Sequence, residues 1–185
     1  SSSPACSWWP RGGSSPIGLP GVATDRTVYP TTDATIPPYD PTANRDRRAL
    51  WGLKRGFETG IGETTGGADN SSRYESKLTE RYRRRWLEWV DRCVDDEPRC
   101  LSLGETDGGV AGYVFLLPER LSFVWDAAVV HELYVVPEER GEGVADALFE
   151  RAIEVAEGQA LPLDRLLLDV DRDNERARRF YERYG

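Results

Sequence analysis

The sequence of 185 residues contains no methionine, a single histidine and only three cysteines. One histidine cannot supply a set of imidazole ligands, and Cys6, Cys93 and Cys100 lack the spacing of metal ligands, so we expect no metal site. The odd number of cysteines also argues against a disulfide framework, and Cys93 and Cys100 are predicted to be small core residues. Because no methionine stands at position 1, we expect the sequence to be part of a longer product.

Lysine and long apolar stretches are scarce as well. Lys54 and Lys77 are the two lysines, and 32 acidic against 24 basic residues give a formal charge of -8. This acidic balance argues against a general nucleic-acid binder. The acidic, lysine-poor composition is typical of a high-salt cytoplasm or of GC-rich coding. We take the halophile as a hypothesis, which stability indifferent to salt would contradict. No stretch is apolar enough to span a bilayer and no signal sequence is recognisable, which predicts a cytoplasmic protein without a membrane partner.

The remaining composition is that of one globular domain with an extension. A chain of 185 residues with 39% apolar side chains can bury one core. Residues 1–33 are rich in Ser, Pro, Gly and Thr without a sustained period, so we expect a disordered or irregular N-terminal extension. Residues 34–185 are expected to form the domain.

Hydrophobic periodicity within the domain predicts strands and helices in turn. Strands are expected over about 34–41, 99–105, 110–119, 123–137 and 163–171, the last buried on both faces. Helices are expected over about 44–60, 74–94, 144–157 and 173–185. This order is typical of an α/β (α+β layered) domain rather than of a helical bundle.

The stretch VVPEERGEGVADALF (residues 135–149) joins an apolar strand to a helix through an arginine and two glycines. A helix N-terminus leaves backbone N–H groups unpaired and carries the positive end of the helix dipole. Gly141 and Gly143 would let an anion approach these donors, and Arg140 adds a cation. The pattern suits a diphosphate, although a glycine-rich turn fits the stretch taken alone. Neither nucleotide fingerprint matches, because no Gly-Lys-Ser/Thr follows and Asp146 stands at the third glycine of G-x-G-x-x-G.

Two ordered motifs resemble the GNAT superfamily of acyl-CoA-dependent N-acyltransferases. In ELYVVPEERGEGVADALFERA, Arg140, Gly143 and Ala145 match the family's Arg/Gln-x-x-Gly-x-Gly/Ala loop. Further on, LLLDVDRDNERARRFYERYG resembles the second signature, whose positions are occupied by Asn174, Ala177, Phe180, Tyr181 and Gly185. With the entry stretch TIPPYDP…RRALWGL, the resemblance spans about residues 34–185.

The resemblance implies a GNAT-like fold. Such a fold has a mixed, mostly antiparallel central sheet flanked by helices. Two of its strands splay apart, here 123–137 and 163–171, and acyl-CoA lies in the cleft between them. The family usually continues with two further strands, so we expect the domain to be truncated after Gly185.

The resemblance also implies which residues bind acyl-CoA. Backbone N–H groups of the first strand would hold the acyl carbonyl and the pantetheine, and the loop would hold the diphosphate. The expected cofactor-binding residues are Leu133, Tyr134, Val135, Arg140, Gly141, Glu142, Gly143, Val144, Ala145 and Asn174. Asn174 would bind the pantetheine arm or a water, and its alternative role is that of a helix cap.

Two side chains are candidates for catalysis. Tyr181 matches the family's tyrosine that protonates the leaving thiolate, and a phenol with an ordinary pKa of about 10 suits a proton donor. Its alternative role is that of an aromatic core residue. Glu132 stands where several members carry a carboxylate that takes the amine's proton, often through water; alternatively it faces solvent. Strand alternation places His131 on the other face, unless a β-bulge intervenes.

The resemblance implies an N-acetyltransferase that transfers an acetyl group from acetyl-CoA to a primary amine of a small molecule or protein by direct attack. A homodimer is left open. One alternative is a non-catalytic acyl-CoA-binding module. Another is a nucleic-acid-associated protein that uses the arginine-rich helix Arg81–Arg85, although such a run is more often a solvated helix face.

Overall fold

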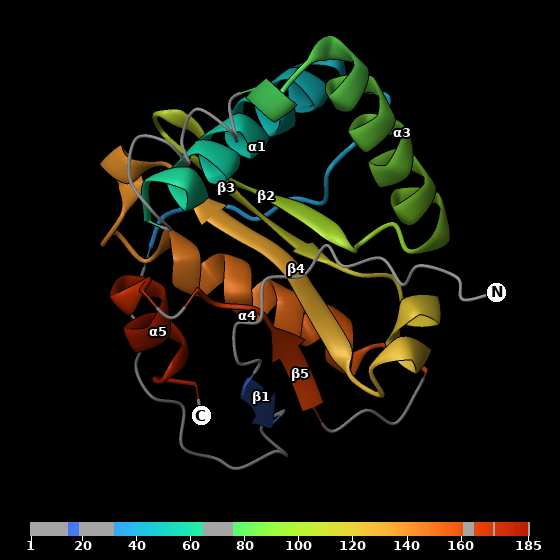
Figure 1. Ribbon diagram of the computed structural model, residues 1–185, viewed down its shortest axis with the longest axis vertical. Coiled ribbons are helices and arrows are strands. Elements are labelled where there is room, and N and C mark those ends of the chain that lie inside the picture. Colours follow the sequence, from blue (N-terminus) through green and yellow to red (C-terminus); the bar gives the residue numbers. More distant parts are fainter. Residues whose placement is uncertain (1–14, 19–31, 65–75, 161–164, 172, 185) are drawn as a thin grey trace, which may run out of the picture.

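The computed structural model describes residues 15–18, 32–64, 76–160, 165–171 and 173–184. The strands are β1 Ser15–Gly18, β2 Leu101–Thr106, β3 Gly109–Leu116, β4 Ala128–Val135 and β5 Arg165–Leu168. The helices are α1 Asn44–Thr64, α3 Glu80–Asp96, α4 Val144–Glu157 and α5 Glu175–Tyr181, with short 3-10 helices η1 Glu119–Val124 and η2 Pro137–Glu139. Figure 1 shows their arrangement.

The strands form one sheet in the order β1-β5-β4-β3-β2. All neighbours are antiparallel except β4 and β5, which run parallel. The predicted α/β class with a mixed, mostly antiparallel sheet is therefore confirmed. β5 pairs with β4 only at Ala128, Val129 and Val130, so the rest of β4 up to Val135 extends beyond the pairing. This is the predicted splay.

Alternate residues of β3 belong to two hydrophobic cores, one on each face of the sheet. Val114 and Leu116 pack with α4, β4 and β5. Tyr113 and Phe115 pack with α1, α3 and β2. Because successive side chains of a strand point to opposite faces, α4 covers one face and α1 with α3 the other (Figure 1).

The helices follow from amphipathic sequence. In α3 the buried residues recur every three or four positions: Trp86, Leu87, Val90, Cys93 and Val94. Thr79 caps the helix by accepting a hydrogen bond from the backbone N–H of Tyr82 at 3.2 Å. The arginines at 81, 84 and 85 are exposed on the remaining surface of this helix. As predicted, Cys93 and Cys100 are buried free thiols.

Four segments differ from the sequence-based expectation. Residues 34–41 make two isolated bridges to β2 rather than a strand. Residues 119–124 form η1, so β4 begins only at Ala128, and the apolar side chains of Phe123 and Val124 are exposed. β5 alternates between half-buried and buried positions instead of being buried on both faces. Within the stretch expected to be irregular, residues 15–18 form β1 against β5, because backbone pairing needs no apolar pattern.

No helix among the described residues is both long and apolar enough to cross a membrane.

Candidate active site

A cavity of about 700 Å³ opens where β4 and β5 separate, with walls from α1, β4, the loop after β4, α4 and α5. Of the residues predicted to bind acyl-CoA or to act in catalysis, its walls contain Leu133, Tyr134, Val135, Arg140, Gly141, Gly143, Ala145, Asn174 and Tyr181. Glu142 is exposed, Val144 and Glu132 are buried, and none of these three lines the cavity. The two sequence motifs therefore meet at one site.

The loop from Arg140 to the start of α4 has the backbone that an anion site requires. Gly141 and Gly143 have φ angles of 89° and 77°, in the left-handed region that favours glycine. Gly143 is the N-cap of α4, and no side chain caps the helix. The first N–H groups of α4 are thus left for another acceptor. Arg140 is fixed beside them, because its Nε donates a hydrogen bond to the backbone oxygen of Val135 at 3.0 Å.

Tyr134 forms the wall between α1 and the loop. Its ring lies edge-on to Phe57 with 6.4 Å between centroids, and the guanidinium of Arg140 lies 5.8 Å from its centroid. On the α1 side it lies against Gly56, where an added Cβ would overlap the Tyr134 hydroxyl group. α1 can approach this closely only because position 56 has no side chain.

α5 contributes Asn174 and Tyr181. The side-chain oxygen of Asn174 accepts a hydrogen bond from the backbone N–H of Ala177 at 3.1 Å, so Asn174 is a helix cap, and it also lines the cavity. Tyr181 packs edge-on against Phe149 with 5.3 Å between centroids, yet it too lines the cavity. The phenol of Tyr181 is protonated at neutral pH, as a phenol with the ordinary pKa of about 10 already is, and burial raises this pKa further. A protonated hydroxyl is what a proton donor needs.

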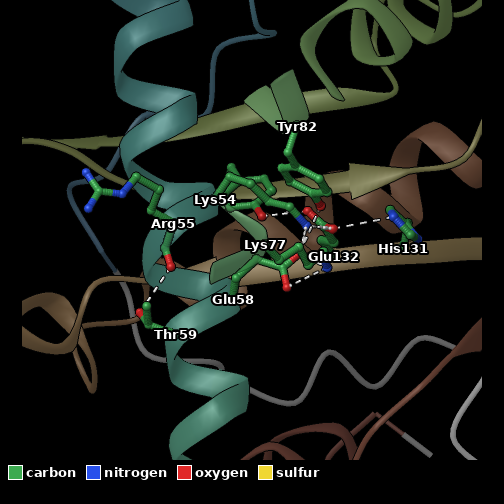
Figure 2. Close-up of polar contacts among 9 residues, drawn as sticks. Lys54, Arg55, Glu58, Thr59, Lys77, Tyr82, His131 and Glu132 are labelled. Carbon is green, nitrogen blue, oxygen red and sulfur yellow. Dashed lines mark hydrogen bonds and ion pairs between the residues drawn. The ribbon is translucent and has the colours of Figure 1, made fainter. Parts of the chain in front are cut away.

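Glu132 belongs to a charge cluster, the Glu58 cluster, made of Lys54, Glu58, Lys77 and Glu132 (Figure 2); Lys54 and Glu58 of α1 and Glu132 of β4 are buried, and Lys77 is partly exposed. Lys54 forms ion pairs with Oε1 of Glu132 and, at 2.7 Å, with Oε1 of Glu58. The hydroxyl of Tyr113 donates to Oε2 of Glu132 at 2.6 Å. Burial lowers the pKa of Lys54, but the two carboxylates outweigh it and raise this pKa, so the ammonium persists. Glu132 thus does not face solvent, and an ammonium already neutralises it.

His131 lies on the same side as Glu132, with 3.4 Å between Nε2 and Oε1 (Figure 2). The register explains this: Phe115 pairs with Glu132, but the next residue, Leu116, pairs with Val130. His131 is therefore the extra residue of a β-bulge, which breaks the alternation assumed from the sequence.

Comparison with known proteins agrees with this geometry. The family model described as acetyltransferase (GNAT) family matches residues 67–185. The chain belongs to this family. A curated relative described as an uncharacterized N-acetyltransferase, from Archaeoglobus fulgidus, is 40% identical over 83 residues, which cover 43% of this chain and 54% of the relative. The chain thus spans about half the length of that relative.

Solved structures share the fold of this GNAT chain. PaiA N-acetyltransferase from Thermoplasma acidophilum, in complex with coenzyme A, matches with a TM-score of 0.64 and 17% identity over 83% of this chain and 89% of that one. An aminoglycoside N-acetyltransferase in complex with CoA matches with a TM-score of 0.59 and 14% identity over 84% and 88% of the two chains. At these identities the likeness concerns the fold.

Sequence reasoning missed three arginines of the GNAT cavity, Arg176, Arg179 and Arg183. Their spacing of three and four places them on one face of the C-terminal helical segment, which was the available signal. Arg179 pairs with Glu175 and Arg183 with Asp146. Within the described residues, no ion pair involves Arg140 or Arg176. Burial and the neighbouring charge of Arg140 lower the pKa of Arg176.

Proposed function

We propose that the chain transfers an acetyl group from acetyl-CoA to a primary amine of a small molecule or protein. The observation that carries this proposal is the meeting of the glycine loop, Asn174 and Tyr181 around one cavity at the splay of the sheet. A cytoplasmic location and the lack of a metal stay predictions from the sequence, and a homodimer stays open.

The cavity walls suggest how acetyl-CoA would bind. The diphosphate would accept hydrogen bonds from the loop between Arg140 and Ala145 and from the first turn of α4, with the guanidinium of Arg176 opposite. The backbone of Leu133–Val135, beyond the last pair between β4 and β5, would bind the pantetheine amides and the thioester oxygen. On the side that faces β5, no strand among the described residues pairs with β4 beyond Val130.

The transfer itself needs one bond to form and one to break. The neutral amine nitrogen attacks the carbonyl carbon of the thioester, a C–N bond forms, and the C–S bond breaks. The backbone N–H groups of β4 stabilise the negative charge on the carbonyl oxygen. Tyr181 gives its proton to the thiolate. Glu132 stays the predicted acceptor of the amine's proton; since it does not line the cavity, that proton would travel through water.

Binding is tested by comparing two thioesters. We expect Arg140→Ala and Arg176→Ala to weaken acetyl-CoA at least tenfold in calorimetric titrations, and to leave acetyl-pantetheine, which lacks the phosphates, unchanged. Arg151→Ala is the matched control, because Arg151 lies on α4 outside the cavity and contacts Glu154 and Ile36. Equal losses for both thioesters would contradict the assignment of the phosphates.

Turnover is tested by following free thiol during incubation with acetyl-CoA and a panel of aliphatic amines, aminosugars and peptides with a free N-terminus. Thiol release that depends on an amine supports the enzyme. Tight binding of acetyl-CoA without turnover on any amine would favour the alternative, a non-catalytic acyl-CoA-binding module.

A further inference from the structure

The Glu58 cluster lies beside the cavity, and none of its four residues lines it. The carboxylate of Glu58 is 4% exposed, and three groups reach it: Nζ of Lys54 at 2.7 Å, Nζ of Lys77 at 3.0 Å and the hydroxyl of Tyr82 at 3.2 Å. Lys54 and Lys77 are the two lysines of the chain. Both therefore converge on one carboxylate.

Without Lys77 the described part of the cluster would carry a buried negative charge. One ammonium, Lys54, faces two carboxylates, Glu58 and Glu132. The neighbouring phenol of Tyr82 does not change this charge: burial raises its pKa to about 12, so it stays neutral, and it has no cationic form. A buried charge without a partner is costly. Among the described residues, Lys77 is the second cation that balances these two carboxylates.

Lys77 supplies such a cation from a partly exposed position. Its side chain is 42% exposed, whereas that of Lys54 is 3% exposed. It comes from a separate segment before α3, not from α1 or β4 (Figure 2). Its Nζ lies 5.1 Å from the ring centroid of Tyr82, so a carboxylate and an aromatic face together receive the ammonium. This combination is typical of alkylammonium recognition.

The cluster adjoins both the cavity and an unused donor. Phe57 and Thr59, the neighbours of Glu58 in α1, line the cavity. The ring of Trp86 lies 5.3 Å from Nζ of Lys54, and its buried indole N–H has no hydrogen-bond partner among the described residues. A ligand reaching from the cavity to Glu58 would pass the apolar ring of Phe57 before it met the carboxylate.

We propose, on the basis of the proposed acetyl transfer, that Glu58 binds an ammonium group of the acceptor and that Lys77 occupies this position when no acceptor is bound. The nitrogen that attacks the thioester must be neutral, so the ammonium at Glu58 is a second group of the same molecule. The acceptor class is then an aliphatic diamine or polyamine, and Lys77 is the internal competitor that it displaces.

The probe is 1,4-diaminobutane, titrated calorimetrically into the full chain. Lys77→Met keeps the aliphatic stem and removes the competing charge, so we expect it to bind the diamine at least tenfold more tightly than the wild type. Lys77→Arg keeps the charge and is expected to match the wild type. The double variant Glu58→Gln/Lys77→Met should lose the gain. Unchanged affinity in Lys77→Met, or a gain that persists in the double variant, would overturn the proposal.

The same proteins separate this proposal from the proposed function. A titration of acetyl-CoA into the wild type reports on the acyl-CoA site alone. If no binding is detected, the proposed acetyl transfer is wrong, whereas the diamine titrations still test the ammonium site at Glu58. If Lys77→Met does not fold, refolding in 1,4-diaminobutane is compared with refolding in an equal concentration of sodium chloride. Recovery only with the diamine supports the proposal, and no recovery counts against it.

Discussion

Tyr181 is the side chain on which the proposed chemistry depends most. General acid catalysis contributes about 10²–10⁴-fold, so Tyr181→Phe should lower kcat for acetyl transfer by at least about a hundredfold. Binding of acetyl-CoA should stay within about twofold, because Phe keeps the packing on Phe149. A fixed-time assay of thiol release measures kcat, and calorimetry measures the binding of acetyl-CoA.

Tyr184 offers the matched control for this substitution. It lies on the same C-terminal segment and packs on Phe149, but its hydroxyl donates to Asp146 at 2.9 Å and it does not line the cavity. Tyr184→Phe should therefore leave kcat unchanged. If both variants lose activity alike, Tyr181 acts only through packing and the acid role is wrong.

Substitution of Lys54 tests how much the Glu58 cluster contributes to the free energy of unfolding. Removing one partner of a buried ion pair typically costs about 3–5 kcal/mol, since the carboxylates of Glu58 and Glu132 lose their shared cation. We expect Lys54→Ala to lower the free energy of unfolding in urea by that amount. Glu154→Ala breaks a surface pair with Arg151 and should cost less than about 1 kcal/mol. Similar losses in both variants would show that the buried pair contributes no more than a surface one.

His131 links stability to pH. Burial lowers its pKa below the ordinary 6.5, although Glu132 opposes this. As pH falls through 6.5 the unfolded chain takes up a proton that the folded chain does not, so stability present above pH 6.5 is lost below it. His131→Phe keeps the aromatic contacts with Trp89 and should lose less stability than the wild type between about pH 7.5 and 5.5. If urea unfolding shows that the wild type and His131→Phe lose the same amount of stability between these two pH values, the prediction is wrong.

At the scale of elements, two glycines of α1 allow the effect of helix propensity on stability to be measured separately from the effect of site shape on binding. A Cβ at Gly52 meets nothing within 4 Å, so Gly52→Ala should stabilise the protein by about 0.5–1 kcal/mol. A Cβ at Gly56 overlaps the hydroxyl of Tyr134, which must then shift. Since Tyr134 lines the cavity, Gly56→Ala should weaken acetyl-CoA binding about tenfold, while Gly52→Ala leaves it unchanged. Equal affinities of the two variants for acetyl-CoA would contradict the assignment of Tyr134 to the wall of the acetyl-CoA site.

The elements also show what sequence can and cannot predict. The loop between Arg140 and Ala145 and the cap at Asn174 depend on neighbours in the chain, and both were predicted from local pattern. The partner of Glu132 is Lys54, 78 residues away, and no local pattern indicates that pairing. The bulge at His131 and the strand at 15–18 arise from backbone pairing with distant strands, so they too lay beyond a reading of periodicity.

On the scale of the whole molecule, positive side chains gather at the cavity although the protein as a whole is negatively charged. The chain carries -8, yet the cavity walls hold four arginines, Arg140, Arg176, Arg179 and Arg183, against the acidic Glu139 and Asp146. A positive cavity on a negative protein concentrates anions at one place and repels them elsewhere. This arrangement supports a polyanionic ligand such as acetyl-CoA and fits poorly with broad binding of nucleic acid.

The most direct test of the central claim is a calorimetric titration of acetyl-CoA into the wild type and into Gly143→Trp. Gly143 lines the cavity with a φ of 77°, so a tryptophan there strains the loop and fills the place assigned to the diphosphate. With circular dichroism confirming that the variant is folded, we predict one binding site in the wild type and a loss of at least about tenfold, or about 1.4 kcal/mol, in the variant. No binding by the wild type, or undiminished binding by the folded variant, would contradict the account.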